Sequence, residues 1–263
     1  MTKTPSTFLR LRLRYWLFTV VACSAILVVR LEVRTAGRFG ADVGAVGAYI
    51  TAIGTLYGIL AAFTIFVVWT QFNEAQTAVD SEAKELLDLF RFAIFLKDAE
   101  VLRALQSSIK DYAASVVRDE WSAMSSGKPS SQAVSRFEAV FQAVHAVRFD
   151  DERDASAWEK MIDKFEGVSD ARAKRLDLAV ANVPGLLRVL LYLVSFALVV
   201  GFLVLAISND LVAIVVTVAT TAIVLLVIEV VEDLDDPFGG QWALKPETFL
   251  DIPEQVDALA TPA

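Results

Sequence analysis

Four long apolar runs, two towards each end of the chain, constrain the fold of this sequence more than any other feature. They span residues 15–29, 44–69, 186–207 and 211–231, and a long charged stretch separates the two pairs. A helix needs about 20 apolar residues to cross the bilayer core. The pattern predicts an all-α integral membrane protein with four transmembrane helices in two pairs and a cytoplasmic helical bundle between them. The first run is short, but it continues past Cys23 without the break that ends a signal sequence.

The predicted organisation has five segments. These are a cytoplasmic N-terminus (1–14), transmembrane helices 1 and 2 (15–73), a cytoplasmic helical region (74–182), transmembrane helices 3 and 4 (183–232) and a cytoplasmic C-terminal tail (233–263). Four basic residues precede the first run, which favours a cytoplasmic N-terminus, and four crossings return the C-terminus to the same side. We therefore expect a multi-pass protein of the inner (cell) membrane. The arginines at positions 30, 34 and 38 oppose the charge rule, because this topology places them outside.

Composition excludes several functional classes. Of the 263 residues, 24 are Lys or Arg and 32 are Asp or Glu, so the formal charge is −8 and nucleic-acid binding is not expected. Cys23 is the only cysteine and His145 the only histidine, which rules out an intramolecular disulfide and a His/Cys zinc cage. We find no constellation of nucleophile, base and metal ligands, so no enzymatic activity is expected.

The middle region shows helical periodicity, with apolar residues three and four positions apart and no alternation of period two. We expect helical pieces with stripes at 86–94, 102–116, 134–144 and 158–165, interrupted by a polar break at 125–131. The favoured interpretation is a bundle that buries these stripes against itself or against neighbouring subunits. Glu120, Trp121, Arg153 and Asp154 are interpreted as solvated or paired groups rather than as an acid/base site.

The second apolar run has an unusual composition. Gly47, Thr51, Gly54, Gly58 and Ala62 recur at spacings of three and four, so they share one helix face, and no charged residue occurs from 43 to 68. Small residues at this spacing are typical of close helix packing, for which Gly47, Gly54 and Gly58 are the candidates. The alternative is that this face or its border lines a pore, where selectivity would come from hydroxyl groups, apolar constriction and size.

An acidic run follows the fourth apolar stretch. Carboxylates are the ligands that calcium prefers, which makes Asp233, Asp235 and Asp236 a calcium candidate. The spacing is not that of an EF-hand, and a solvated acidic face is the competing interpretation. No other cofactor is expected.

Two segments resemble the bestrophin channels, and the closest similarity is to bacterial bestrophin-like membrane proteins. The first, Trp69-Thr-Gln-Phe-Asn-Glu74, is similar to the stretch that leaves the second membrane helix of bestrophins. The second, Asp236-Pro-Phe-Gly239, is similar to the segment after their fourth helix. A Glu-Trp pair at 120–121 and an Arg-x-x-Arg-Leu motif at 172–176 match further short motifs of the bacterial group. Together these motifs extend over roughly residues 40 to 250.

The resemblance implies a homopentameric ion channel with one central pore lined by the second membrane helix, passing small anions such as chloride. It places the three neck positions of the family on Thr51, Thr55 and Ile59, and the neck glycine on Gly58. Two of these neck residues are threonines instead of large apolar residues, which implies a wetter and wider constriction. The acidic run that calcium-dependent members carry after Pro-Phe-Gly is missing, which argues against calcium control.

Two hypotheses follow for the function. In the first, the chain assembles with copies of itself in lipid, the pore passes small inorganic anions, and Arg34 and Arg38 contribute a positive ring at the outer mouth. In the second, the chain is a non-conducting membrane scaffold or sensor whose cytoplasmic bundle binds a partner. Gly54 and Gly58 would then serve only helix packing.

Overall fold

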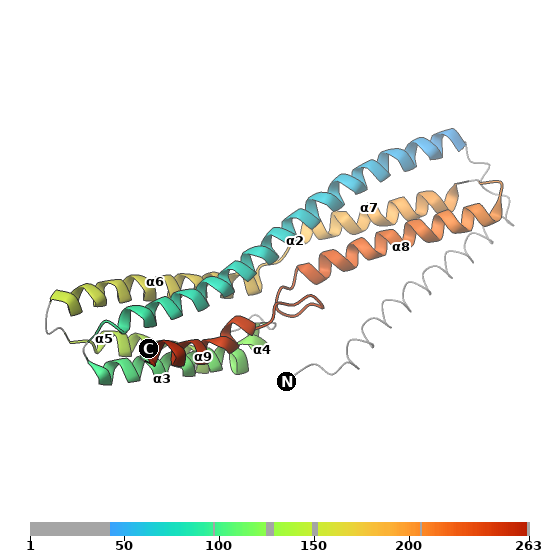
Figure 1. Cartoon of the computed structure of the whole chain (residues 1–263). Helices are drawn as coiled ribbons and strands as arrows, with labels where there is room; N and C mark the ends of the chain where they lie inside the picture. Colours follow the sequence, from blue (N-terminus) through green and yellow to red (C-terminus); the bar gives the residue numbers. More distant parts are fainter. Residues whose placement is uncertain (1–42, 97, 125–128, 149–151, 206, 262–263) are drawn as a thin grey trace. The chain divides into compact units, whose positions relative to one another are not determined.

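A computed structural model describes residues 43–96, 98–124, 129–148, 152–205 and 207–261. In this part of the chain all regular structure is helical, which confirms the all-α class (Figure 1). The helices are α2 (Val43–Ala93), α3 (Ala99–Ser115), the π-helical stretch η1 (Val116–Glu120), α4 (Trp121–Met124), α5 (Ser131–His145), α6 (Glu152–Val180), α7 (Gly185–Val204), α8 (Asp210–Leu234) and α9 (Glu247–Ala260). The first predicted span, residues 15–29, lies outside the described residues.

Local sequence signals explain where several helices begin. The Asp98 carboxylate accepts hydrogen bonds from the Glu100 and Val101 amides and caps α3, and the Ser130 hydroxyl accepts from the Ala133 amide and caps α5. The Asn209 side chain accepts from the Leu211 and Val212 amides at the start of α8. Each cap satisfies backbone donors that have no partner within the helix. Pro184 directly precedes α7. Because proline has no amide proton to donate, helical hydrogen bonding is interrupted there between α6 and α7.

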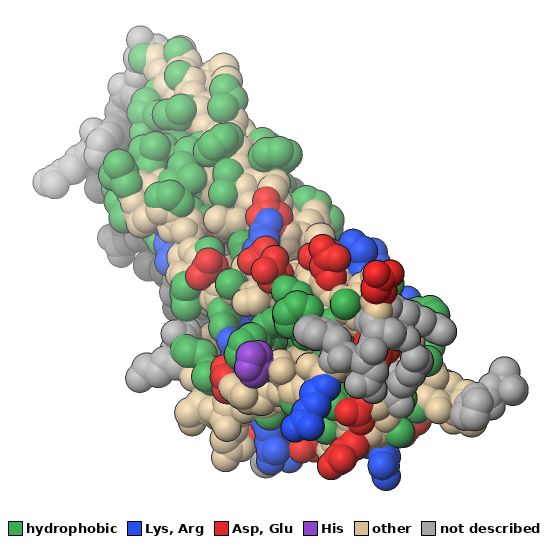
Figure 2. Space-filling model, turned by 90° about the vertical axis from the view of Figure 1, so that its left-hand side faces the viewer, with side chains coloured by type: hydrophobic (Ala, Val, Ile, Leu, Met, Phe, Trp, Pro, Cys, Tyr) green, Lys and Arg blue, Asp and Glu red, His purple; other side chains and the backbone are tan. Residues whose placement is uncertain are grey.

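The chain divides into two compact units. The membrane unit comprises the described residues up to Trp69 together with Val183–Asp233, and the bundle unit comprises Thr70–Asn182 and Leu234–Ala263. Three helical stretches among the described residues are long and apolar enough to cross a membrane, and they contain the first half of α2, α7 and α8. Hydrophobic side chains cover most of the visible surface of the membrane unit, whereas acidic and basic side chains gather on the bundle unit (Figure 2). Lipid is the environment that such an apolar surface requires.

Helix α2 continues without a break from the apolar run into the charged region. The sequence pattern predicts separate helical pieces for the run at 44–69 and the stripe at 86–94, whereas the structure joins them into one helix of 51 residues. The sequence between them contains no proline and no glycine, so nothing in it interrupts the ladder of backbone hydrogen bonds.

The bundle unit has a continuous apolar core. The predicted stripes at 86–94 and 102–116 supply much of it, since Leu86, Phe90, Leu105 and Ile109 are fully buried. The predicted stripe on α5 is only partly correct, because Val144 is buried as predicted but Val134 and Phe141 are exposed, and Ala133, Val140 and Ala143 complete the buried face. Phe137, in the middle of the predicted stripe, is partly buried against the core, between the rings of Tyr112 and Phe165.

The segment predicted as a C-terminal tail contributes a core helix. Phe249, Ile252 and Val256 of α9 are buried in the bundle core. On the surface of the unit, Lys110 and Gln106 of α3 donate hydrogen bonds to the Asp257 carboxylate at 2.8 Å. The end of the chain is thus an integral part of the bundle unit.

Candidate functional site

One face of α2 in the membrane unit is turned away from the other described helices. Thr51, Thr55 and Ile59, the three predicted neck residues, are all exposed in the single chain, and 65% of the Ile59 surface is accessible. Tyr57, Ala61, Thr64 and Val68 form the buried face of the same helix. At about 100° per residue, the centres of these two faces lie about 150° apart around the helix axis. The predicted neck residues therefore share an outward face.

The two threonines of this face use their hydroxyl protons within the helix. Thr51 donates to the Gly47 carbonyl at 2.9 Å, and Thr55 donates to the Thr51 carbonyl at 2.8 Å. Such bonds satisfy the hydroxyl proton and leave oxygen lone pairs directed outward. In this rotamer the outward face offers hydrogen-bond acceptors, and a hydroxyl must turn before it can donate to an anion.

The three predicted packing glycines differ in their surroundings. A Cβ added to Gly54 would lie 3.7 Å from Leu198 Cδ1 of α7, an ordinary contact, whereas one added to Gly47 or Gly58 would meet no atom within 4 Å. The tightest approach involves a glycine that the sequence analysis did not select. A Cβ on Gly201 of α7 would lie 2.9 Å from Ile50 Cγ1 and 3.2 Å from Tyr49 Cε1 of α2. Gly201 therefore permits the close packing of α7 on α2.

Asp233, Asp235 and Asp236 lie at and just after the end of α8. Among the described residues of the single chain, no three His, Cys, Asp or Glu side chains are grouped to hold a metal ion, and the calcium candidate formed by Asp233, Asp235 and Asp236 stays a prediction. Asp236 stabilises a turn, since its carboxylate accepts from the Gly239 amide at 2.8 Å and its carbonyl accepts from the Gly240 amide. Arg34 and Arg38 lie outside the described residues.

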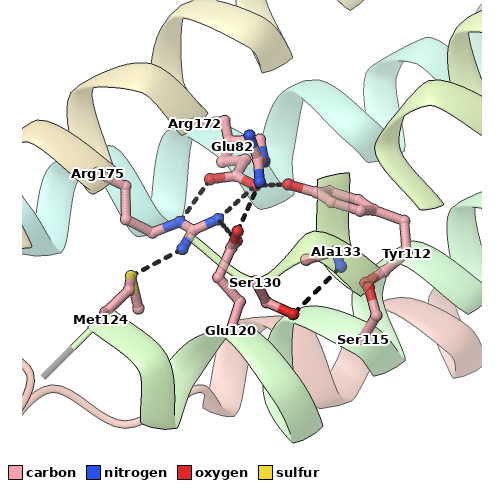
Figure 3. Close-up of polar contacts among 9 residues, drawn as sticks. All are labelled: Glu82, Tyr112, Ser115, Glu120, Met124, Ser130, Ala133, Arg172 and Arg175. Carbon is pink, nitrogen blue, oxygen red and sulfur yellow. Dashed lines mark hydrogen bonds and ion pairs between the residues drawn. The ribbon is translucent and has the colours of Figure 1, made fainter. Parts of the chain in front are cut away.

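A cluster of buried charges ties the bundle unit together (Figure 3). Arg175 donates to Glu82 through Nε at 2.7 Å and to Glu120 through Nη2 at 2.7 Å. Arg172 donates to the second oxygen of Glu120, and the Tyr112 hydroxyl donates to Glu82, each at 2.5 Å. The two arginines balance the two glutamates, so the cluster is neutral overall. Because each carboxylate accepts hydrogen bonds from two residues, the cluster of Glu82, Tyr112, Glu120, Arg172 and Arg175 resembles a structural clamp more than an acid/base site.

The clamp and the neighbouring Met124 come from five helical elements. Glu82 lies on α2, Tyr112 on α3, Glu120 on η1, Met124 on α4 and Arg175 on α6. The π-helical stretch inserts one residue into the turn before Trp121, and Glu120 at its end is fully buried. Such bulges reorient the side chains that follow them. Arg175 Nη1 completes the arrangement with a 2.9 Å contact to the Met124 sulfur.

Burial and neighbouring charges shift the pKa values of two residues of the clamp, Arg175 and Tyr112. Burial opposes the charge on Arg175, but the Glu82 and Glu120 carboxylates outweigh it and raise the pKa of the guanidinium. Burial, together with the neighbouring Glu82 carboxylate, raises the pKa of Tyr112 well above its usual value. Arg175 thus stays charged and Tyr112 neutral, the states that their hydrogen bonds require.

Trp121 links the clamp to the C-terminal segment. It follows Glu120 directly, and its indole Nε1 donates to the Leu244 carbonyl at 3.2 Å. Its ring contacts the ring of Phe238 edge-on, with the two ring centres 5.5 Å apart. Arg175 lies over the ring of Phe249, 5.7 Å from its centre. The Glu-Trp pair, the Arg-x-x-Arg-Leu motif and the Pro-Phe-Gly segment therefore meet in one place, although the sequence analysis assigned the first two no joint role.

The fold and the apolar helices define an all-helical membrane protein. A family model, the bestrophin-like domain, matches residues 17–249. The chain belongs to the bestrophin-like family, which confirms the resemblance found in the sequence.

Solved structures share this fold. A point variant of a bacterial bestrophin homologue from Klebsiella pneumoniae has a TM-score of 0.71 and 15% sequence identity, and the match covers 95% of this chain and 99% of that one. Another structure of the Klebsiella pneumoniae homologue has a TM-score of 0.68 and 16% identity over 94% of this chain and 97% of that one. A variant described only as a membrane protein has a TM-score of 0.72 and 15% identity over 92% and 97%. A search of curated proteins found no match.

Proposed function

We propose that this chain is a bestrophin-like ion channel, assembled as a homopentamer around a single pore lined by α2, and that it conducts small anions such as chloride. The proposal places the chain in the inner membrane with both termini in the cytoplasm. Membership of the bestrophin-like family supports the channel class. It gives no reason to expect an enzyme.

The observation that carries the proposal is the outward face of α2. A span that only anchored the chain in lipid is expected to expose predominantly apolar side chains. Here the exposed face carries Thr51 and Thr55 above Ile59, and the helix has no charged residue from 43 to 68. A mildly polar face bordered by Ile59 suits a water-containing neck with one apolar constriction, formed when copies of α2 surround a common axis.

Anion preference rests on charge outside the neck. The hydroxyls of Thr51 and Thr55 donate to helix carbonyls and give no fixed donors for chloride. We therefore assign the attraction of anions to Arg34 and Arg38 at the outer mouth, where five copies would bring ten positive charges from these two positions. Glu32 and Asp42 offset part of that field.

The first test is the mass of the purified particle, followed by single-channel recording in bilayers. Native mass spectrometry should give a particle of five chains of 28.8 kDa. Ile59→Ala should change unitary conductance, whereas Ile223→Ala should not, because Ile223 is equally exposed at 60% but lies on α8. A monomer or dimer without current would reject the pore and favour the scaffold or sensor.

Ion selectivity needs a separate measurement. Under a tenfold KCl gradient the reversal potential should lie near the chloride equilibrium potential, and replacing Arg34 and Arg38 with Glu should move it towards potassium. A wild-type potential near the potassium value would reject anion selectivity while leaving the pore intact. An unchanged potential in the double variant would remove the outer arginines from the selectivity mechanism.

A further inference from the structure

A hollow of about 320 Å³ lies within the bundle unit, between the part of α2 that follows Trp69 and the segment leading into α9. Phe72 and Asp80 line it from α2, and Trp242, Lys245, Glu247 and Thr248 line it from the C-terminal segment. Ligand pockets in proteins range from about 300 to 1,000 Å³. The hollow is therefore large enough for a small polar group but too small for a complete lipid molecule.

The walls of this hollow are anchored on both sides. Before α9, the Leu244 carbonyl accepts from Trp121, and the Leu244 amide donates to the Pro237 carbonyl at 2.8 Å. In the first turn of α9, the Thr248 hydroxyl donates to Asp80 at 3.0 Å, and Phe249 is buried in the core. Trp242 and Lys245 are thus presented by a fixed segment, and the shape does not depend on a loose chain end.

The exposed groups at the hollow indicate what kind of molecule it takes. Trp242 is 58% exposed, although its neighbours in the segment are anchored. Two carboxylates, Asp80 and Glu247, line the same hollow as one ammonium group, Lys245, which forms an exposed ion pair with Glu247 at 3.5 Å, and these three side chains sum to −1. An aromatic face beside carboxylates favours an organic ammonium group, and a nearby lysine accommodates a phosphate. A purely anionic head group would meet a net negative charge.

The position of the hollow along α2 identifies the source of such a group. Phe72 follows Trp69, the last α2 residue of the membrane unit, by three residues, or about 5 Å along the same helix. Trp and Lys are the side chains that membrane proteins place at the level of lipid head groups. We propose that this hollow binds the phosphoethanolamine head group of a membrane lipid, with the ammonium against Trp242, Asp80 and Glu247 and the phosphate near Lys245.

The test is competition between lipids in the full-length protein. Protein from nanodiscs with equal amounts of phosphatidylethanolamine and phosphatidylglycerol is released, and its lipid adducts per chain are counted by native mass spectrometry. Phosphatidylethanolamine should be enriched about two- to fivefold, the ratio that one exposed cation–π contact provides. Trp242→Ala and Glu247→Gln should each reduce this enrichment. Equal retention of the two lipids by the wild type would overturn the proposal.

Matched variants separate this site from the general lipid surface. Phe95→Ala removes an exposed aromatic of the bundle unit, and Asp251→Asn removes an exposed acid of α9, and both lie outside the hollow. Both should retain the wild-type enrichment. A loss in these controls equal to that in Trp242→Ala would also overturn the proposal, because the effect would then not be local.

A final arm distinguishes a lipid from a soluble source of the same chemistry. Glycerophosphoethanolamine, which has no acyl chains, should displace phosphatidylethanolamine only at millimolar concentration and less in Trp242→Ala. Binding of the soluble compound without any preference for the lipid would overturn the assignment to a lipid. Adducts are counted per chain, so the result does not depend on the oligomeric state or on conduction.

Discussion

The two units differ in the range of the hydrogen bonds made by several of their buried polar side chains. In the membrane unit, the hydroxyls of Thr64, Ser195, Thr217 and Thr221 each donate to the carbonyl four residues earlier, at 2.7 to 2.8 Å. In the bundle unit, Arg175 reaches partners 93 and 55 residues away in the sequence. A hydroxyl bond within one helix does not join that helix to a neighbour, so packing positions the membrane helices. The buried ion pairs of the clamp, in contrast, join particular helices of the bundle to one another.

The largest loss of stability is expected from a substitution that breaks the clamp of buried charges. Arg175→Met keeps much of the side-chain volume but leaves the buried carboxylates of Glu82 and Glu120 without their shared cation. Loss of one partner from a buried ion pair costs about 3–5 kcal/mol of unfolding free energy. Thermal unfolding followed by circular dichroism measures this. Lys110→Met, which breaks the exposed pair with Asp257, should cost less than about 1 kcal/mol. Equal losses in the two variants would contradict the role of the clamp.

A smaller effect is expected where α7 packs on α2. Gly201→Val places new atoms against Ile50 and Tyr49, and overpacking of this kind costs about 1–3 kcal/mol. Gly185→Val on the same helix is the matched control, because a Cβ there meets no atom within 4 Å. Thermal stability in detergent should fall in the first variant only. A stable Gly201→Val protein would show that the contact between the two helices adjusts easily.

Removing a local hydroxyl bond should have less effect again. Thr221→Val deletes the bond to the Thr217 carbonyl, but that carbonyl keeps its place in the helix ladder. Polar bonds within membrane helices contribute on average about 0.6 kcal/mol. The melting temperature should therefore change little. A loss as large as that in Arg175→Met would contradict the contrast between the two units.

The smallest effect concerns pH. Hydrogen bonds from Lys110 and Gln106 lower the pKa of Asp257 below its usual value near 3.8. A lowered pKa in the folded state stabilises the protein above the unfolded-state value, and this contribution is lost as the pH falls through the folded-state value. The stability difference between the wild type and Asp257→Asn should therefore be present at pH 6 and shrink below pH 4. Unfolding curves at both pH values measure it, and a difference that grows in acid would reverse the sign.

The sequence predicted the class of the fold from local information and missed what depends on distant contacts. Long apolar runs identify membrane helices because each run alone has the length of a span. Helix α9 was missed although Phe249, Ile252 and Val256 repeat at spacings of three and four, a signal that was present but not used. The clamp had no such signal, since nothing in the spacing of Glu82 and Arg175 pairs them. The π-helical turn that buries Glu120 has no pattern of its own.

The candidate site divides in the same way. Thr51, Thr55 and Ile59 are four residues apart, so helical periodicity places all three on one face once the orientation of any one of them is known. Gly201 was missed because the helix that it contacts is distant in the sequence. The acids after α8 illustrate the limit of composition. They suggest calcium ligands, which stays a prediction, and the structure adds that the Asp236 carboxylate stabilises a turn, a use that composition does not indicate.

The unbroken course of α2 has a mechanical consequence. Ile59 and Glu82 are 23 residues apart on one helix, about 35 Å along its axis, with neither proline nor glycine between them. Within the bundle unit, the Arg175 and Tyr112 hydrogen bonds to Glu82 restrain the rotation of α2, whereas the exposed Ile59 side chain in the membrane unit has no charged contact. A rotation of α2 by one residue position, about 100°, would exchange the side chains presented on its outward face.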